Sequence, residues 1–230
     1  MRLMSIALLY DVHGNLLALN AVLEDAEAAG ADSYLLGGDY AAFGPWPRET
    51  VERLGLVPRA LWIRGNGERW LIDGAGPARN GHELVQNALR TANDALGSSL
   101  VTKLYALPER AQLNGILFCH GSPLSDVESF APTAQPGEEQ LLAGDTSRTV
   151  VFGHSHQQFS RQGPSNTQLV NPGSVGMPLD GDPRAAWALL DRGKFDFRRS
   201  PYDVERAASK MRSHGDWAER LARRIENGSD

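Results

Sequence analysis

The stretch LMSIALLYDVHGNLLALNAVLEDAEAAGADSYLLGGD, residues 3–39, decides the fold. Its first part, Leu3–Tyr10, is an apolar run typical of a buried strand, and Ser33–Leu36 predicts a second strand. Between them, leucines and alanines recur at spacings of three and four residues until Gly30, which predicts a helix. A helix between two strands is a βαβ unit, so the chain opens as an α/β protein.

The rest of the chain continues with short strands and helices. Further strands are predicted at Ala60–Arg64, Ile116–Cys119, Thr149–Phe152, Gln157–Arg161, Gln168–Val170, Ala186–Leu190 and Phe195–Arg199. Helices are predicted from Leu84 to Ala95, from Ser98 to Leu107 and in the C-terminal stretch, which is expected to pack on the outside. No repeat or Pro/Ser-rich linker divides the chain. We therefore expect a single domain over residues 1–230, with a C-terminal helical extension over about residues 201–230.

Composition and charge exclude several classes of protein. The 230 residues are 41% hydrophobic and 22% charged, which argues against a disordered or fibrous chain. The run Leu3–Tyr10 is too short to span a membrane and has no signal-peptide cleavage site behind it. The net charge of −5 argues against extended nucleic-acid binding, because that mode needs a basic patch. The single cysteine, Cys119, excludes an intramolecular disulfide and indicates a cytoplasmic protein.

Metal-ligand side chains follow five of the predicted strands. In chain order they are Asp11, His13, Asp39, Asn66, His120, His154 and His156, and they include four of the six histidines. The carboxyl ends of strands in an α/β sheet meet at one crevice, so we expect these loops to converge. Carboxylate, imidazole and amide oxygen form a mixed N/O ligand set, which suits Mn, Fe, Zn, Co or Ni better than Ca or Mg.

The order of these residues resembles the calcineurin-like metallophosphoesterases. That family shows D-x-H, G-D, G-N-H-D/E, a lone H and G-H-x-H in this order. The chain has Asp11-x-His13, Gly38-Asp39, Gly65-Asn66-Gly67-Glu68, His120 and Gly153-His154-Ser155-His156. The segments at residues 13–16 and 171–176 are similar to the small bacterial-type branch. The resemblance implies a four-layer α/β sandwich, in which two facing mixed β-sheets are flanked by helices.

The resemblance also implies a dinuclear metal site and its chemistry. One divalent ion would be held by Asp11, His13, Asp39 and His156, and the other by Asp39, Asn66, His120 and His154, with Asp39 bridging. Mn is the first choice for both ions, with Fe, Zn, Ni, Co or Mg as the others. The implied reaction is hydrolysis of a small phosphomonoester or phosphodiester by a metal-bridging hydroxide, and Asp39, Asn66 and His120 are its catalytic residues. The natural substrate and the oligomeric state are left open.

One residue departs from the family pattern. The family usually has a histidine after Gly-Asn, which helps to protonate the leaving group, and this chain has Gly67. Water or another side chain such as His82 could replace it, or the natural leaving group needs little protonation. Alternatively, the protein is a weak or inactive phosphate- or nucleotide-binding scaffold. The complete set of seven ligands weighs against that alternative.

Three further residues are candidates for contacting the substrate. Asn15 follows the first ligand pair, Arg48 lies in the Gly- and Pro-containing loop after Asp39, and Glu68 follows Gly67. Each also has a structural interpretation: Arg48 lies in a loop that can be packed for its own sake, and Glu68 fits a surface acid in the first turn of a short helix. Cys119 is expected to be buried and inert, and Asp180-Gly181-Asp182 to be a simple turn.

Overall fold

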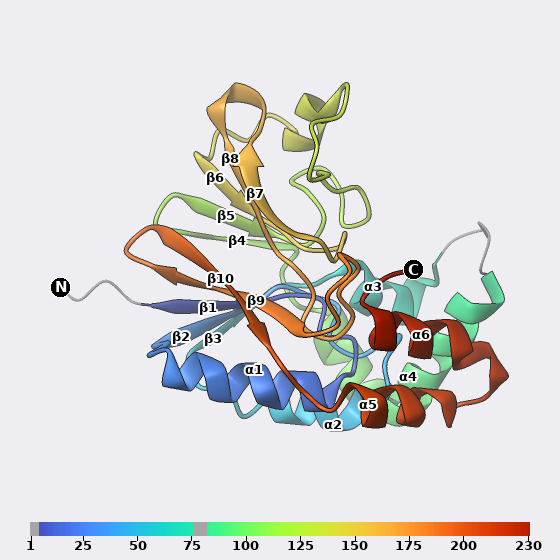
Figure 1. Ribbon diagram of the computed structural model, residues 1–230. Helices are drawn as coiled ribbons and strands as arrows, with labels where there is room; N and C mark the ends of the chain where they lie inside the picture. Colours follow the sequence, from blue (N-terminus) through green and yellow to red (C-terminus); the bar gives the residue numbers. More distant parts are fainter. Residues whose placement is uncertain (1–4, 76–81) are drawn as a thin grey trace.

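The protein is built on two five-stranded β-sheets that face each other (Figure 1). The structure is a computed structural model, and it describes residues 5–75 and 82–230. The first sheet has the order β10 (Lys194–Ser200), β9 (Ala185–Asp191), β1 (Ile6–Leu9), β2 (Ser33–Leu36) and β3 (Ala60–Trp62). The second has the order β4 (Arg110–Leu113), β5 (Ile116–Cys119), β6 (Thr149–Val151), β8 (Gln168–Pro172) and β7 (Gln158–Gln162).

Both sheets are mixed, and their parallel strands set the position of the site. In the first sheet β1, β2 and β3 are parallel, while β9 runs antiparallel to β1 and β10. In the second sheet β5, β6 and β8 are parallel, and the outer strands β4 and β7 are antiparallel to their neighbours. Parallel strands end at the same edge of a sheet, so the loops after them lie together.

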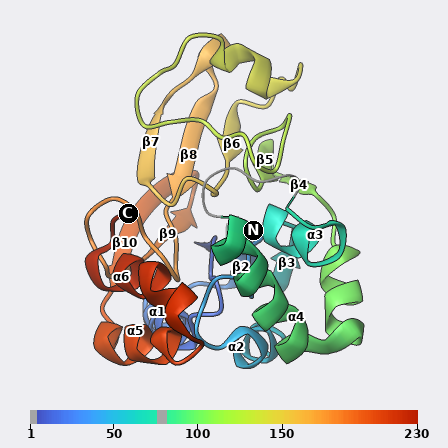
Figure 2. The ribbon, with the colours of Figure 1, turned by 90° about the vertical axis from the view of Figure 1, so that its right-hand side faces the viewer.

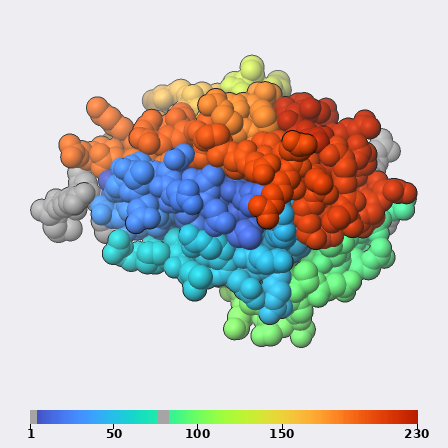
Figure 3. Space-filling model, turned by 60° about the horizontal axis from the view of Figure 1, so that its bottom comes forward, coloured from blue at the N-terminus to red at the C-terminus, as the bar shows by residue number. Residues whose placement is uncertain are grey.

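Helices cover the outer face of the first sheet. The α-helices of the described chain are α1 (Leu16–Ala28), α2 (Pro47–Leu54), α3 (Asn66–Asp73), α4 (His82–Tyr105), α5 (Val204–Arg212) and α6 (Glu219–Asn227). The short helices η1 (Glu138–Leu142) and η2 (Pro164–Asn166) belong to the part of the chain that forms the second sheet, and η3 (Asp216–Ala218) lies between α5 and α6. Figure 3 shows α1, α2, α4 and the C-terminal helices forming one continuous outer surface. Within the described ranges, none of the helices is both long and apolar enough to span a membrane.

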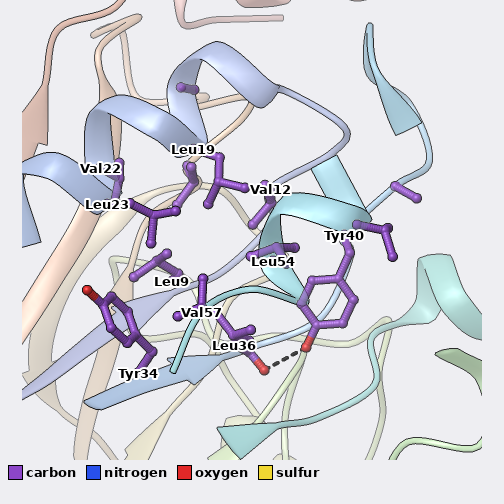
Figure 4. Close-up of a cluster of buried hydrophobic side chains, with 14 of the residues drawn as sticks. Leu9, Val12, Leu19, Val22, Leu23, Tyr34, Leu36, Tyr40, Leu54 and Val57 are labelled. Atoms are coloured by element: carbon purple, nitrogen blue, oxygen red, sulfur yellow. Dashed lines mark hydrogen bonds between the residues drawn. The ribbon is translucent and has the colours of Figure 1, made fainter. Parts of the chain in front are cut away.

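The main core lies between this helical layer and the first sheet (Figure 4). Leu19 and Val22 of α1 pack onto the same cluster as Leu9 of β1 and Leu36 of β2. The buried Tyr40 hydroxyl donates to the carbonyl of Leu36 at 2.7 Å, so the polar end of this side chain is satisfied. Burial of such side chains stabilises the fold by about 1.5–3 kcal/mol each.

Two smaller cores hold the second sheet in place. Between the sheets, Leu8 and Leu35 meet Phe118, Val151 and Val170. On the outer face of the second sheet, residues 121–148 with η1 bring Phe130 and Leu142 onto the strands. The predicted architecture of two facing mixed sheets flanked by helices is confirmed.

Most predicted elements are present, and among those that were missed are one strand and one α-helix. The break between the predicted helices 84–95 and 98–107 is found inside α4, where Gly97 has φ 73°. The part of the first predicted strand at residues 3 and 4 lies outside the described residues. Strand β4 was missed although Asn114-Gly115, with φ 52° and 78°, joins it to β5 as a tight hairpin turn. Helix α2 was also missed; it begins at Pro47, whose fixed φ suits a first helical turn.

Candidate metal centre

The carboxyl ends of the parallel strands bring the seven predicted ligands together. Asp11 and His13 follow β1, Asp39 follows β2, Asn66 begins α3 after β3, His120 follows β5, and His154 and His156 follow β6. Figure 2 looks onto this edge, with α6 at one side and α3 and α4 at the other. Asp11, His120 and Asn66 are each 2% exposed or less, so the cluster lies inside the protein.

The backbone of the cluster is held in a strained conformation. Asp11, His13, Asp39, His154 and His156 all have positive φ, between 45° and 63°. Each such residue costs about 1–3 kcal/mol and persists only where its surroundings impose it. Here they do, because the Asp11 and His13 amides donate to the carbonyls of Gly38 and Asp39 at 3.1 and 2.8 Å. The two loops therefore brace each other and aim their side chains at one point.

Three imidazoles are oriented by backbone carbonyls. The Nδ1 atoms of His13, His120 and His156 lie 2.9, 2.9 and 2.7 Å from the carbonyl oxygens of Ala42, Gly37 and Met177. In the neutral ring, a proton on each Nδ1 leaves the free lone pair on Nε2, which is how a protein prepares a histidine as a metal ligand. The Nε2 atoms of His13 and His156 lie 3.0 Å apart, so both lone pairs point at the same place.

His154 uses its other nitrogen. Its Nδ1 lies 2.9 Å from the amide oxygen of Asn66, so this pair converges through Nδ1 and Oδ1. The amide can also be placed the other way round, with its NH₂ donating to His154 Nδ1 and to His120 Nε2 at 2.9 and 3.0 Å. In either orientation, the same end of the Asn66 amide faces the nitrogens of His154 and His120. If a cation lies between these three groups, that end must be the amide oxygen.

Asp11 shows most directly that the cluster fits a cation. Its Oδ1 is buried, and within the described residues nothing donates a hydrogen bond to it. It lies 3.4, 3.7 and 3.8 Å from the Nε2 atoms of His156, His120 and His13. A buried carboxylate oxygen without a hydrogen-bond donor is costly, and a metal ion bound between this oxygen and the imidazole nitrogens would satisfy all of these atoms. Two groups have ligand atoms close enough to share an ion: Asp11 with His13 and His156, and Asp11 with Asp39 and His120.

Asp39 lies between the two groups of imidazoles. Its Oδ1 is 3.4 Å from His120 Nε2 and its Oδ2 is 3.9 Å from His13 Nε2. The Gly67 amide donates to Oδ1 at 2.6 Å. A Cβ at position 67 would lie 2.9 Å from that oxygen and 3.1 Å from the carboxyl carbon. The φ of Gly67 lies outside the left-handed region, so the backbone conformation does not require a glycine. Glycine is needed at position 67 because a Cβ would lack space beside Asp39.

Glu68 holds the backbone of the Asp39 loop. Its carboxylate is fully buried and accepts from the amides of Asp39, Tyr40 and Gly65 at 2.8, 2.7 and 2.9 Å. The interpretation of Glu68 as a surface acid is therefore wrong. Both oxygens are taken by backbone amides, so Glu68 acts on the site by positioning Asp39, and nothing here supports its predicted contact with the substrate.

Burial and mutual charge set the protonation of the cluster. Burial raises the pKa of Asp39 to about 7, against the opposing effect of His120. Burial disfavours the charged form of His120, but Asp39 and Asp11 raise its pKa to about 9. Burial and a neighbouring imidazole lower the pKa of His13 to about 3 and that of His154 to about 4. His13 and His154 are thus neutral ligands at pH 7, while His120 keeps its second ring proton and Asp39 is partly protonated, and a cation must displace these protons.

This protonation predicts that cation binding releases protons. At pH 7 we expect about one to two protons per chain to be released, and the affinity for Mn²⁺ to rise between pH 6 and 9 because the competing protons leave His120 and Asp39. Calorimetric titration with Mn²⁺ in buffers of different ionisation enthalpy measures both quantities. An affinity that is constant or falls over this range contradicts the assignment.

Replacing Glu68 is expected to destabilise the metal-free protein. In Glu68→Gln the NH₂ end of the amide faces backbone N–H groups, and each donor left unpaired costs about 1–3 kcal/mol. Urea unfolding should show a loss of about 2–4 kcal/mol in the free energy of unfolding. The control is Glu49→Gln, an exposed acid in the first turn of α2, which should change it by less than about 0.5 kcal/mol. Equal stability of the two variants would show that the Glu68 network contributes nothing.

A cavity of about 270 Å³ opens beside the cluster. Ligand-type residues on its wall are His13, Asp39, Asn66, His154 and His156; the others are Phe43, Trp70, Leu84, Val85, Met177, Arg220 and Arg224. It contains both charged groups and apolar surface, the combination typical of a small-molecule binding site.

The structure does not bring two of the predicted substrate residues to this cavity. Arg48 donates to Glu52 at 2.8 Å and to the carbonyls of Ala95 and Leu96, so its guanidinium is held against α4. Asn15 is fully buried and caps α1 by accepting from the Ala18 amide, while its NH₂ donates to the Gly176 carbonyl. Both residues have structural roles, and the prediction of substrate contacts is corrected for them. The side chain of His82, the suggested substitute acid, lies outside the described part of the chain.

Several residues of the site were missed by sequence reasoning. Ser174 donates to the Asp11 carbonyl at 2.7 Å, and Asn171 donates to the Gly153 carbonyl at 2.9 Å, so the segment at residues 171–176 supports both ligand loops. Arg220 and Arg224 reach the cavity from α6, in a stretch predicted to pack on the outside. Their spacing of four residues on a helix was the available signal.

The fold and the cluster define a metal-binding α/β protein, and comparison with known proteins gives the family. The family model described as a calcineurin-like phosphoesterase superfamily domain matches residues 4–193. The chain therefore belongs to the calcineurin-like phosphoesterase superfamily, as its motifs predicted.

Individual relatives extend the likeness over nearly the whole chain. An uncharacterized protein of Methanocaldococcus jannaschii, MJ0912, is 27% identical in an alignment of 228 positions that covers 90% of this chain and 91% of the relative. The crystal structure of a metallophosphoesterase from Sphaerobacter thermophilus has a TM-score of 0.80 at 26% identity and covers 98% of this chain and 99% of its own. The hypothetical protein PH1004 from Pyrococcus horikoshii OT3 has a TM-score of 0.80 at 20% identity, with 99% of both chains covered.

Proposed function

We propose that this protein is a dinuclear-metal-dependent hydrolase of phosphomonoesters or phosphodiesters. The observation that carries the proposal is the buried Asp11 Oδ1, which has three imidazole Nε2 atoms within 3.8 Å and nothing among the described residues that donates to it. Membership of the superfamily supports the reaction class.

The residues divide into two ligand sets that share Asp39. Asp11, His13, Asp39 and His156 would hold one ion, and Asp39, Asn66, His120 and His154 the other. The separate orientations of the two Asp39 oxygens, toward His120 and toward His13, support a bridging role. The mixed N/O donor set favours Mn²⁺ over Ca²⁺.

When bound, two divalent ions lower the pKa of water to supply a nucleophile and neutralise charge on the transferring phosphoryl group. The chain supplies a rigid frame for this chemistry. The carbonyls of Ala42, Gly37 and Met177 fix the tautomers of three histidines, and Glu68 and Gly67 fix Asp39. Such preorganisation keeps reorganisation small during the reaction.

The test is metal-dependent release of nitrophenol. Protein stripped with a chelator should be inactive on 4-nitrophenyl phosphate and bis(4-nitrophenyl) phosphate, and addition of Mn²⁺ should restore turnover of at least one of them. Metal analysis of the same samples should give two ions per chain at saturation. Full metal occupancy without turnover of either ester would instead favour the phosphate-binding scaffold.

The substrate class and location complete the proposal. The cavity suits a small phosphate ester rather than an extended nucleic acid, and the net charge of −5 supports this. The buried thiol of Cys119, whose pKa is raised by burial, is inert, as expected for a protein that works in the reducing cytoplasm.

A further inference from the structure

Two arginines from the C-terminal helix line the same cavity as the metal-type side chains. Arg220 and Arg224 lie one turn apart on α6 and share a cavity wall with His154 and Trp70. The opposite face of α6 is anchored by Leu221, Ala222 and Ile225, which are fully buried. The helix therefore presents both guanidiniums to the cavity from a fixed base.

A carboxylate of the chain itself is bound between these arginines. Asp230 Oδ1 accepts from Arg220 Nη2 and Nε at 2.8 and 3.2 Å and from Arg224 Nε at 2.7 Å. A single oxygen thus receives hydrogen bonds from two guanidiniums, in the way that an oxygen of a phosphate group does.

The path of the chain after α6 makes this contact a built feature. Gly228 reverses the chain with φ 62°, and its amide donates to the Arg224 carbonyl at 2.9 Å. Its carbonyl accepts from the Gly181 amide at 2.7 Å, which ties the turn to the loop after the second sheet. The turn brings the segment back over α6 to the end marked C in Figure 1.

We propose that Arg220 and Arg224 form an anion subsite for a second phosphate group of the substrate, and that Asp230 is the intramolecular occupant of this subsite. The inference rests on the proposed function and deepens it, because it limits the substrate class to phosphate esters that carry another phosphoryl group. One carboxylate oxygen uses only part of the donors of two guanidiniums, whereas a tetrahedral phosphate can accept from both forks at once.

Asp230 is easily displaced from this position. The side chains of Arg220 and Asp230 are 57% and 53% exposed, and ion pairs so open to water add little to stability. In a substrate with two phosphate groups, the group held at the cluster keeps the other group beside the arginines. The second group therefore competes with Asp230 at a high effective concentration. Asp230 thus acts as a weak internal competitor that a monophosphate does not need to displace.

The test compares ethane-1,2-diphosphonate with ethylphosphonate as inhibitors of 4-nitrophenyl phosphate hydrolysis by the Mn²⁺-loaded protein. The two probes differ only in the second phosphoryl group. We expect the diphosphonate to bind about tenfold more tightly in the wild type. Asp230→Asn, or removal of residues 229–230, should increase this ratio by about three- to fivefold, and the double change Arg220→Gln with Arg224→Gln should reduce it to about one.

Arg223→Gln is the matched control. Arg223 lies on the same helix but pairs with Glu219 and is 69% exposed, so its loss should leave the ratio as in the wild type. An unchanged ratio in the double arginine variant, or a ratio that falls when Asp230 is removed, would overturn the subsite. An equal fall in the Arg223 variant would show a general charge effect and would also overturn it.

A second readout separates this inference from the proposed reaction. In metal-free protein, NMR titration of the arginine side-chain Nε–H resonances with ethylphosphonate reports the subsite directly. We expect shifts at Arg220 and Arg224 that grow when Asp230 is removed, whether or not any ester is hydrolysed. If the shifts appear but no ester is hydrolysed, the proposed hydrolase is rejected and the subsite is retained. If esters are hydrolysed but the shifts do not appear, the subsite is rejected and the proposed hydrolase is retained.

Discussion

The Asp39→Asn variant is expected to lose hydrolysis of both nitrophenyl esters by about 10³-fold or more and to bind fewer metal ions per chain. Asp39 presents one oxygen to His120 and the other to His13, so it belongs to both ligand sets. An amide offers a single neutral oxygen, and it cannot replace a bridging carboxylate. Metal analysis and initial rates at saturating Mn²⁺ are the measurements.

The fold of this variant can be checked separately from its metal binding. Burial raises the pKa of Asp39, so its ionised form is disfavoured in the metal-free protein and a neutral amide is tolerated. The amide oxygen can still accept from the Gly67 amide. We therefore expect the Tm in chelator to be equal to or above that of the wild type. Asp94→Asn, at an exposed position of α4, is the control for both measurements. Wild-type rates and full occupancy in Asp39→Asn would reject the bridging assignment.

The alternation of short apolar runs with ligand-type residues made the sheets and the ligand cluster predictable. Asp11, Asp39 and His120 each lie within three residues of the end of a strand. Because neighbouring parallel strands end at a common edge, these residues were expected to meet. What the sequence could not show is the local backbone, in which five of the seven ligands have positive φ.

The residues that sequence reasoning misplaced have partners far away in the chain. Glu68 lies 29 residues from Asp39, and its burial depends on how α3 docks against the loop after β2. The sequence near Arg48 contains no sign of a partner for its guanidinium, but α4 supplies two carbonyl acceptors that lie 47 and 48 residues away in the chain. The arginines of α6 join the cavity only because the C-terminal helices pack beside the ligand loops. Periodicity describes which face of an element is buried and carries no information on such partners.

The strongest dependence on substrate is expected to come from the leaving group. Nitrophenolate leaves without a proton, whereas the alkoxide of a sugar or serine needs one, and a placed general acid contributes about 10²–10⁴-fold. Gly67 stands where the family has its histidine, so rates in the wild type should fall steeply from aryl to alkyl phosphates. Initial rates on 4-nitrophenyl phosphate and on glycerol 3-phosphate at saturating Mn²⁺ give this ratio. A shallow dependence would show that another group already donates the proton.

The structure changes what restoring that histidine should do. A Cβ at position 67 would lie 2.9 Å from Asp39 Oδ1, and this carboxylate is buried and held by the Gly67 amide, so it must shift. Gly67→Ala and Gly67→His both introduce the Cβ, and both should therefore weaken Mn²⁺ binding, by about tenfold if the shift costs about 1.4 kcal/mol. Calorimetric Mn²⁺ titration of both variants measures this loss, and wild-type affinity in Gly67→Ala would show that the loop accommodates the atom freely.

Comparison of the two variants isolates the imidazole from the Cβ. If the new side chain acts as a general acid, Gly67→His should exceed Gly67→Ala on glycerol 3-phosphate by much more than on 4-nitrophenyl phosphate, with both measured at matched metal occupancy. Equal rates of the two variants on both esters would mean that the imidazole does not reach the leaving group. In that case the absent histidine reflects the space needed by Asp39.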